Sequence, residues 1–202
     1  MKQFFNDRIP HNGFTYSEYQ KRFEEKANSD FSSLKGEELE KYNYTKLNLQ
    51  RTIRIHKTYK VSEVLKNVLN DIKTPQLWMV LTENWCGDSA QNLPYIAMIA
   101  SQSNKIDLRI LERDSNLEIM DQYLTNGISR SVPKLVAFDS DGNEIFQWGP
   151  RPMEAQMIVE NAKLNNLPKE EFVETLHLWY GRNRGKAIEV EFLELLTGKK
   201  KS

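Results

Sequence analysis

The spacing of hydrophobic and polar residues predicts helices in the first part of the chain. Thr15 and Glu18 have the spacing of a capping box, and Tyr16, Tyr19 and Phe23 then fall on one helical face. Such a face packs against a core, because side chains three and four residues apart lie above one another on a helix.

The helical pattern continues as far as a proline. Residues 36–58 are charged and less regular, and a helix describes them best. A clear amphipathic stripe follows, with apolar residues at helical spacing, namely Val61, Val64, Leu65, Val68, Leu69 and Ile72. Pro75 ends this helix, because proline lacks the N–H that a further turn requires.

The middle of the chain alternates between strands and helices. Four short apolar runs are typical of buried strands and span residues 77–83, 106–111, 135–138 and 144–148. Helical patterns between and after them span residues 88–103, 116–125, 152–165, 169–180 and 187–196. Asn126-Gly127 is expected to close the second of these helices, and Gly181–Lys186 to form an exposed turn. This order predicts an α/β fold, in which a mixed β-sheet is flanked by helices.

Composition narrows the function classes. The chain has 202 residues with one cysteine, which excludes an intrachain disulfide, a Cys-rich zinc site and an iron–sulfur cluster. Its 28 basic and 28 acidic side chains balance, so no overall charge attracts it to nucleic acid. No run reaches the roughly 18 apolar residues of a membrane span, and the N-terminus lacks a signal-peptide core. Together with the single cysteine, these features predict a cytoplasmic protein.

The single cysteine, Cys86, lies where the first predicted strand ends and a helix begins. Free N–H groups and the helix dipole favour its thiolate, Gly87 permits a tight turn, and Ser89 is placed to hydrogen-bond the sulfur. Asp88 acts in the opposite direction, because a neighbouring carboxylate disfavours a second negative charge. We therefore expect the pKa of Cys86 to be lowered, but by less than the dipole alone would produce. The alternative is that Cys86 is a small packing residue.

These residues resemble a known family. Trp85-Cys86-Gly87-Asp88-Ser89, followed by Pro94, is similar to the active-site helix of the thioredoxin superfamily, and most similar to subgroups with Trp-Cys-Gly-Asp-Cys or Trp-Cys-Gly-Asp-Ser. Ser131-Val132-Pro133 resembles the cis-proline loop of that family, and the hairpin that ends in Trp148-Gly149 resembles its last two strands. The resemblance covers roughly residues 76–165.

The resemblance implies a thioredoxin-like fold and a role for each part of the motif. Cys86 would be the nucleophile, and a cis Val132-Pro133 peptide would lie beside it, where a substrate chain pairs as an additional strand. Trp85 would shield the thiol and offer a flat contact surface. The expected substrate-binding residues are Trp85, Gly87, Asp88, Val132, Pro133 and Arg151. For Arg151, two interpretations stay open: a partner for an anionic group such as a glutathione carboxylate, or a plain helix-start charge.

Two departures from the family pattern bear on chemistry. Ser89 occupies the place of the second, resolving cysteine, and serine cannot attack a mixed disulfide. Val80 replaces a buried aspartate that lies six residues before the first cysteine in the family and helps to move protons. Both changes argue against an efficient general disulfide reductase. They leave a monothiol site at Cys86, with Ser89 as its hydrogen-bond partner.

The sequence thus predicts a thioredoxin-like protein in which Cys86 carries out thiol–disulfide exchange or deglutathionylation. An external thiol, such as glutathione, would resolve the mixed disulfide, and no metal or resident cofactor is expected. The partners would be protein or low-molecular-weight thiols and disulfides, with no nucleic acid and no membrane. The alternatives are a non-catalytic binding module that uses the Trp85/Pro133 groove, and a redox sensor that dimerises through Cys86.

The remainder of the chain is expected to narrow the approach to this site. A helical extension, the thioredoxin-like domain and a C-terminal helical extension are predicted at residues 1–75, 76–165 and 166–202. The histidines, His11, His56 and His177, lie outside any ligand-spaced motif. Each is expected at a surface or core position, and a Cys–His nucleophile pair is the alternative. Residues 199–201 are expected to form a solvated lysine tail.

Overall fold

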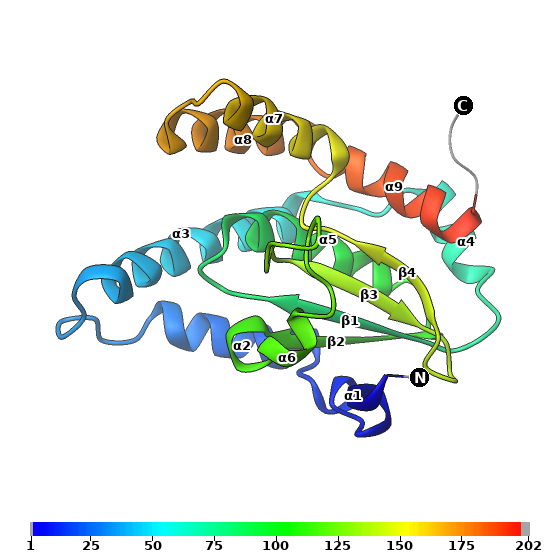
Figure 1. Cartoon of the computed structure of the whole chain (residues 1–202). Coiled ribbons are helices and arrows are strands. Elements are labelled where there is room, and N and C mark those ends of the chain that lie inside the picture. Colours follow the sequence, from blue (N-terminus) through cyan, green and yellow to red (C-terminus); the bar gives the residue numbers. More distant parts are fainter. Residues whose placement is uncertain (1, 199–202) are drawn as a thin grey trace.

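The sheet of the protein has four strands in the order β2-β1-β3-β4 (Figure 1). The structure is a computed structural model that describes residues 2–198, so the predicted lysine tail lies outside the described residues. The strands are β1 (Gln76–Thr82), β2 (Ile106–Glu112), β3 (Lys134–Phe138) and β4 (Glu144–Trp148). β1 runs parallel to β2 and antiparallel to β3, and β3 pairs antiparallel with β4. The sheet is therefore mixed, as the sequence predicts.

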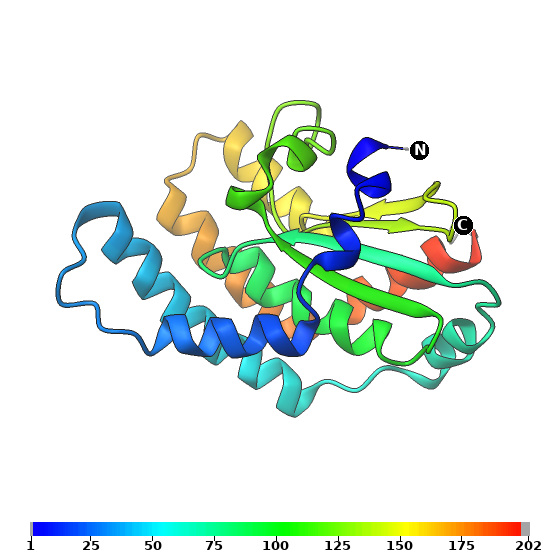
Figure 2. The same cartoon turned by 90° about the horizontal axis from the view of Figure 1, so that it is seen from below.

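Helices flank this sheet on both faces (Figure 2). Their bounds are α1 (Gln3–Asn6), α2 (Tyr16–Ala27), α3 (Gly36–Thr58), α4 (Glu63–Asn70), α5 (Gly87–Ala100), α6 (Leu117–Met120), α7 (Met153–Leu164), α8 (Lys169–Asn183) and α9 (Lys186–Thr197). The predicted α/β fold class, a thioredoxin-like mixed sheet flanked by helices with further helices at both ends, is confirmed.

One face of the sheet is covered by α5 together with helices from both ends of the chain. Trp78 and Val80 of β1 point to this face and are fully buried. Phe23 of α2, Ile55 of α3 and Phe192 of α9 pack into the same cluster. The terminal helices therefore share a hydrophobic core with the sheet, and this fixes α3 close to α5.

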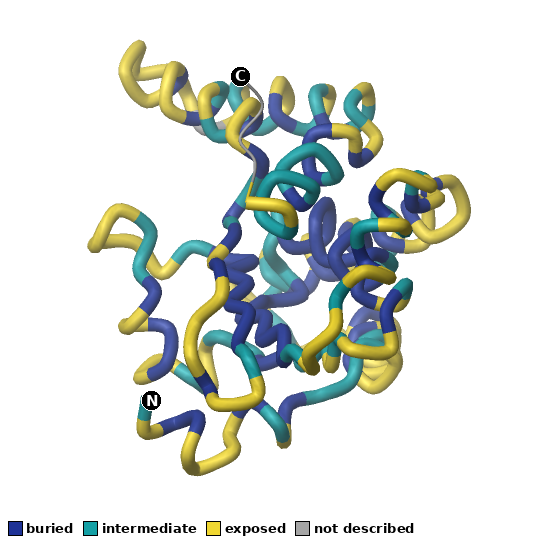
Figure 3. The backbone as a smooth tube through the Cα atoms, turned by 90° about the vertical axis from the view of Figure 1, so that its right-hand side faces the viewer, coloured by how far each residue is buried: buried dark blue, intermediate teal, exposed yellow. Residues whose placement is uncertain are grey.

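The opposite face is covered by short segments. Met79 and Leu81 alternate with the first set along β1 and contact Phe4 and Phe5 of α1 and Met120 of α6 within one cluster. The sequence pattern does not predict α1, because two adjacent aromatic residues show no periodicity. Figure 3 shows the buried residues gathered at the sheet and at the helices that pack on it.

Several local predictions hold. At the start of α2 the Glu18 N–H donates to Thr15 Oγ1 at 3.3 Å and the Thr15 N–H donates to Glu18 Oε2 at 2.8 Å, so the capping box is present. The predicted helix at residues 36–58 coincides with α3. Each predicted strand lies within one residue of the observed one.

Two predicted helices are shorter than expected. α4 starts after Val61, and Val64 of the predicted stripe is 64% exposed, because Leu65 and Leu69 alone form the buried face of this helix. α6 ends at Met120 rather than at residue 125. Tyr123 leaves the helical path, since its ring packs on Phe4 and its hydroxyl donates to Glu144 Oε1 at 2.8 Å.

The predicted turn at Gly181–Lys186 is also shorter. α8 continues to Asn183, and only Arg184 and Gly185 separate it from α9. Gly185 has φ +86°, and a Cβ at this position would lie 2.5 Å from Cε1 of Tyr95. The turn is therefore formed where the backbone must approach an aromatic ring closely, which only glycine permits.

Candidate functional site

Cys86 is the residue before the first turn of α5, directly after β1. Its backbone is extended (φ −80°, ψ 122°), and its side chain is half-buried. The thiol donates a hydrogen bond to the Val132 carbonyl oxygen at 3.2 Å, and the Val132-Pro133 peptide is cis. Val132 and Pro133 are themselves buried. The structure therefore places the loop at 131–133 beside the sulfur.

The expected direction of the Cys86 pKa is wrong. Burial, and next the Asp88 carboxylate, raise the pKa of the thiol to about 11. Hydrogen bonds from the Ser89 N–H and hydroxyl and from the Asp88 N–H lower this pKa, but they do not offset burial. The helix terminus favours the thiolate, but placing a charge in a largely apolar setting costs more. Cys86 is consequently a neutral thiol at pH 7.

Ser89 is buried one turn along α5. Its Oγ has no hydrogen-bond partner among the described residues when the thiol is neutral. The hydroxyl is therefore free to donate to a thiolate, which agrees with its lowering effect on the Cys86 pKa. Val80, in the place of the family's buried aspartate, is fully buried in β1.

Asp88 and Arg151 form an ion pair that ties α5 to the segment before α7. Arg151 Nη2 and Nε both contact Asp88 Oδ2, the latter at 3.1 Å, and Arg151 Nη1 donates to Gln156 Oε1 at 2.7 Å. The Tyr180 hydroxyl of α8 donates to Asp88 Oδ1 at 2.7 Å, and Asn92 Nδ2 donates to the same hydroxyl oxygen. The anionic group that Arg151 binds is thus a carboxylate of the chain itself. Arg151 still lines the pocket at Cys86, and its binding of a glutathione carboxylate stays a prediction.

On the other side of Cys86, polar residues of α3 hold the loop that precedes it. Asn48 Nδ2 donates to the Asn84 carbonyl oxygen at 2.9 Å, and the Thr45 hydroxyl donates to Asn84 Oδ1 at 3.2 Å. Arg51 Nη1 donates to Asn48 Oδ1 at 2.8 Å. Thr45, Asn48 and Thr52 are all buried. Their helical spacing is visible in the sequence, but a polar stripe gives no hydrophobic signal, so the sequence analysis missed this network.

A pocket of about 230 Å³ opens at Cys86 between α3 and α8. Polar or charged groups from Arg51, Asp88, Arg151 and His177 line it together with Trp85, Cys86 and Gly87. The rest of its wall is apolar or aromatic and consists of Tyr44, Val159, Phe172, Val173 and Leu176. Arg51 and the α8 residues are functional candidates that sequence reasoning did not assign to the site.

His177 and Arg51 approach the N-terminus of α5 across Gly87. A Cβ at Gly87 would lie 3.2 Å from His177 Cε1 and 3.5 Å from Arg51 Nη1, so the glycine makes room for both side chains. Burial, and next the nearby Arg51 charge, lower the pKa of His177 to about 4. His177 is therefore uncharged at pH 7. The other histidines lie elsewhere: His11 packs on Phe5, and His56 contacts the Tyr16 hydroxyl.

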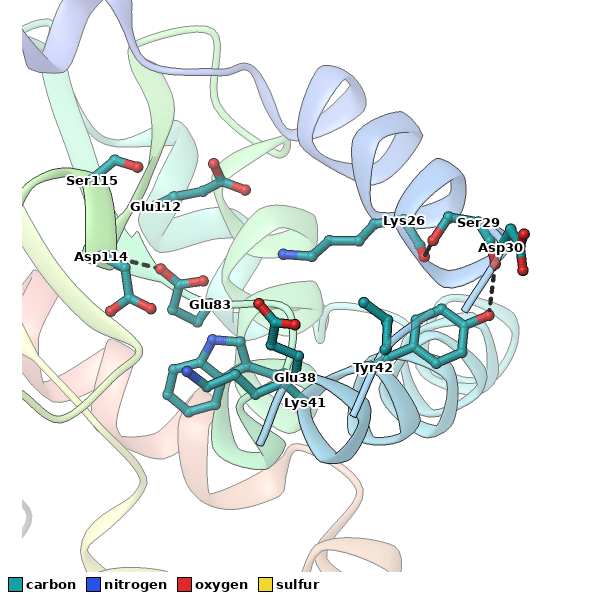
Figure 4. A pocket seen from close by; sticks show the side chains of 12 residues that line it. Lys26, Ser29, Asp30, Glu38, Lys41, Tyr42, Glu83, Glu112, Asp114 and Ser115 are labelled. Atoms are coloured by element: carbon teal, nitrogen blue, oxygen red, sulfur yellow. Dashed lines mark hydrogen bonds between the residues drawn. The ribbon is translucent and has the colours of Figure 1, made fainter. Parts of the chain in front are cut away.

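Trp85 separates this pocket from a larger one. The guanidinium of Arg113 and the ammonium of Lys41 lie 5.0 and 5.5 Å from the centre of an indole ring. The larger pocket, of about 500 Å³, lies between the α2–α3 connection and the ends of β1 and β2. Figure 4 shows Lys26 pointing across it toward Glu83 and Glu112. Trp85 therefore packs against two cationic side chains and also lines the Cys86 pocket.

Within residues 2–198, no three His, Cys, Asp or Glu side chains gather as metal ligands would. In the same part of the chain, no helix combines the length and apolar composition that crossing a membrane requires.

Comparisons with known proteins give one family. The sequence model of the thioredoxin family matches residues 36–163, a range that begins with α3 and includes the whole sheet. No curated protein matches the chain. Among solved structures, a protein of unknown function from Pseudomonas aeruginosa is similar, with a TM-score of 0.55 and 15% identity over 92% of this chain and 98% of that one. An HIV epitope scaffold has a TM-score of 0.54 and 16% identity over 93% of this chain and 100% of its own. At these identities the likeness concerns the fold alone.

Proposed function

The chain belongs to the thioredoxin family, and we propose that it is a monothiol member in which Cys86 exchanges disulfides with small or protein thiols. The observation that carries this proposal is the position of the sulfur. Cys86 is half-buried at the wall of a pocket and is hydrogen-bonded to the Val132 carbonyl, so a disulfide bound in the pocket meets the thiol beside a backbone edge.

The exchange has two balanced steps. Cys86 loses its proton to solvent, and its thiolate attacks one sulfur of a disulfide R–S–S–R, which forms Cys86–S–S–R and releases R–S⁻ to be protonated by water. An external thiol R′–SH, as its thiolate, then attacks the R sulfur of the mixed disulfide, which forms R–S–S–R′ and releases the Cys86 thiolate to take up a proton. No net oxidation of the protein results. Ser89 contributes a hydroxyl that stabilises the thiolate, and it cannot resolve the mixed disulfide.

The finer assignments belong to this proposal. We propose membership of the Trp-Cys-Gly-Asp-Cys/Ser subgroup on the basis of residues 85–89, with glutathione or another external thiol as the resolving reagent. The division of the chain at residues 75 and 165, and a cytoplasmic location, stay predictions. The same holds for a redox sensor that dimerises through Cys86.

A second function is favoured by the raised pKa of Cys86. A thiol that is neutral at pH 7 and donates to Val132 acts as a structural hydrogen-bond donor. In that case the protein is a binding module, and Trp85 with the Pro133 loop holds a ligand without chemistry.

Mass spectrometry of the intact protein separates the two functions. After incubation with glutathione disulfide at pH 8.5 (on the alkaline side because the thiolate reacts), exchange predicts one glutathionyl group on wild type and none on Cys86→Ser. Addition of excess reduced glutathione should remove the group. If wild type stays unmodified while Cys86→Ser retains the protein partners that wild type captures, exchange is excluded and the binding module is supported.

A further inference from the structure

The Cys86 pocket contains a positive charge that forms no ion pair with any carboxylate of the described residues. We propose that this charge, on Arg51, forms an anion subsite that selects low-molecular-weight thiols and disulfides carrying a carboxylate. The inference rests on the proposed exchange function and names the substrate class of that site.

Among the described charged side chains that line the pocket, Arg51 is the one without an ion-pair partner of opposite charge. Arg151 is paired with Asp88, so these two cancel. Cys86 and His177 are neutral at pH 7. Among the described residues, Arg51 has no ion-pair partner, and its one hydrogen bond as a donor goes to the neutral amide of Asn48. The pocket therefore has a formal charge of +1 before a ligand enters, and a monoanion balances it.

The position of Arg51 is defined by the fold. Asn48 holds Nη1 while it also binds the loop before Cys86 through the Asn84 carbonyl, so the guanidinium and the thiol are positioned by one network. Arg51 Nη1 also lies close to Gly87, at the first turn of α5. Free N–H groups at that helix end carry a partial positive charge. A carboxylate between the two would receive hydrogen bonds from a guanidinium, which suits carboxylates through its planar geometry.

The size and the apolar wall of the pocket limit the rest of the ligand. Its volume of about 230 Å³ lies below the range of roughly 300–1,000 Å³ that is usual for drug-sized ligands. The apolar side chains of Phe172, Val173 and Leu176 on α8 favour a ligand with methylene groups over one with polar groups at this wall. A short aliphatic mercaptocarboxylate, such as 3-mercaptopropionate, combines the three required parts: a sulfur, a short apolar chain and a carboxylate.

Two alkylating reagents of similar size test the subsite in the full chain. Iodoacetate carries a carboxylate and iodoacetamide is neutral, and the ratio of their rates is independent of the thiolate fraction of Cys86. Arg51→Gln should lower the iodoacetate-to-iodoacetamide ratio about fivefold, since it removes an attraction between opposite charges in a partly buried site. Lys57→Gln removes one exposed charge from the last turn of the same helix and should leave the ratio unchanged. Arg51→Lys should restore part of the ratio.

The outcomes distinguish the subsite from the exchange reaction. An unchanged ratio in Arg51→Gln, or an equal fall in Lys57→Gln, overturns the subsite even if glutathione disulfide still modifies Cys86. A fallen ratio without any mixed disulfide supports the subsite and excludes exchange.

A second measurement covers the case in which both reagents react too slowly to compare. In Cys86→Ser, methylthioacetate should shift the NMR signals of the His177 ring at millimolar concentration, and the additional Arg51→Gln change should abolish the shift. Absence of any shift in the Cys86→Ser protein would overturn the subsite.

Discussion

Two polar networks hold the Cys86 loop, one on each side, and they differ in whether their charges are matched within the chain. Toward α7 and α8, the Asp88 carboxylate receives the Arg151 guanidinium and the Tyr180 hydroxyl. Toward α3, the Asn84 backbone is held by Asn48, and Arg51 is attached to that amide alone. Both networks are formed by residues far apart in sequence.

The difference separates a structural role from a binding role. A buried charge needs a partner, because removing it from water costs several kcal/mol. Arg151 has that partner inside the protein, so its charge is matched by Asp88 before any ligand enters. Arg51 stays at the wall of the pocket with its charge unmatched, so a ligand supplies what the fold does not. The arginine proposed to bind an anion at this site is therefore Arg51, which precedes the strands in sequence.

The largest expected effect concerns the reactivity of Cys86, to which the matched network contributes. Its pKa of about 11, against an ordinary value of 9.0, lowers the thiolate fraction at pH 8 about a hundredfold. The greater nucleophilicity of a more basic thiolate offsets part of this loss. Alkylation by iodoacetamide at pH 8 should therefore be about ten- to a hundredfold slower than for an exposed cysteine, and should increase with pH up to about 11. Asp88→Asn should shift the profile to lower pH, because it removes a negative charge near the sulfur.

The raised pKa of Cys86 also makes the free energy of unfolding depend on pH. Between about pH 9 and about pH 11 the unfolded chain loses the Cys86 proton while the folded chain keeps it, so the free energy of unfolding should fall as the pH rises. Cys86→Ser should remove this part of the fall in the free energy of unfolding, as measured by urea unfolding.

For the alkylation of Cys86, a pH profile with a midpoint near or below 8 would show that the helix terminus outweighs burial.

The comparison between the two arginines is sharpened by matched substitutions. Arg151→Gln leaves the mostly buried Asp88 without its cation and should lower the free energy of unfolding by about 2 kcal/mol. Arg51→Gln removes one hydrogen bond to a neutral amide and should cost about 0.5–1 kcal/mol. Urea unfolding at pH 7 measures both.

An exposed ion pair provides the control for this prediction. Arg130 and Asp121 have side chains that are 46% and 45% exposed, so Arg130→Gln should change stability by about 0.5 kcal/mol or less. Equal losses for Arg151→Gln and Arg51→Gln would contradict the distinction between a matched and an unmatched charge.

The smallest expected effect concerns Gly87, which leaves room for the His177 side chain between the two networks. Gly87→Ala places a Cβ 3.2 Å from His177 Cε1, so the pocket should narrow and the reaction with a small disulfide should slow a few-fold. Gly181→Ala in α8 meets no atom within 4 Å and should raise stability by about 0.5–1 kcal/mol without changing Cys86. Initial rates of mixed-disulfide formation and thermal unfolding test the pair. A rate equal to wild type in Gly87→Ala would show that the His177 ring moves aside freely.

The sequence predicts the fold better than it predicts the site. The strands follow from short apolar runs, and the start of α2 follows from Thr15 and Glu18, because these signals lie within a few residues. The position of Cys86 between β1 and α5 is local in the same sense. The contact between Asp88 and Arg151 spans 63 residues, and that between Gln91 and His177 spans 86, so no local pattern reports either.

The sequence by itself determined the mixed sheet, the place of the single cysteine before a helix and the absence of a second thiol, because these depend on residue identity and short-range spacing. The tertiary structure decided the chemistry of that cysteine. Packing of distant segments around the loop partly removes the thiol from water and raises its pKa, whereas the helix terminus considered alone lowers it. The same packing pairs Arg151 with Asp88 and leaves Arg51 unmatched, because the cost of burying a charge depends on which distant groups the fold brings to it.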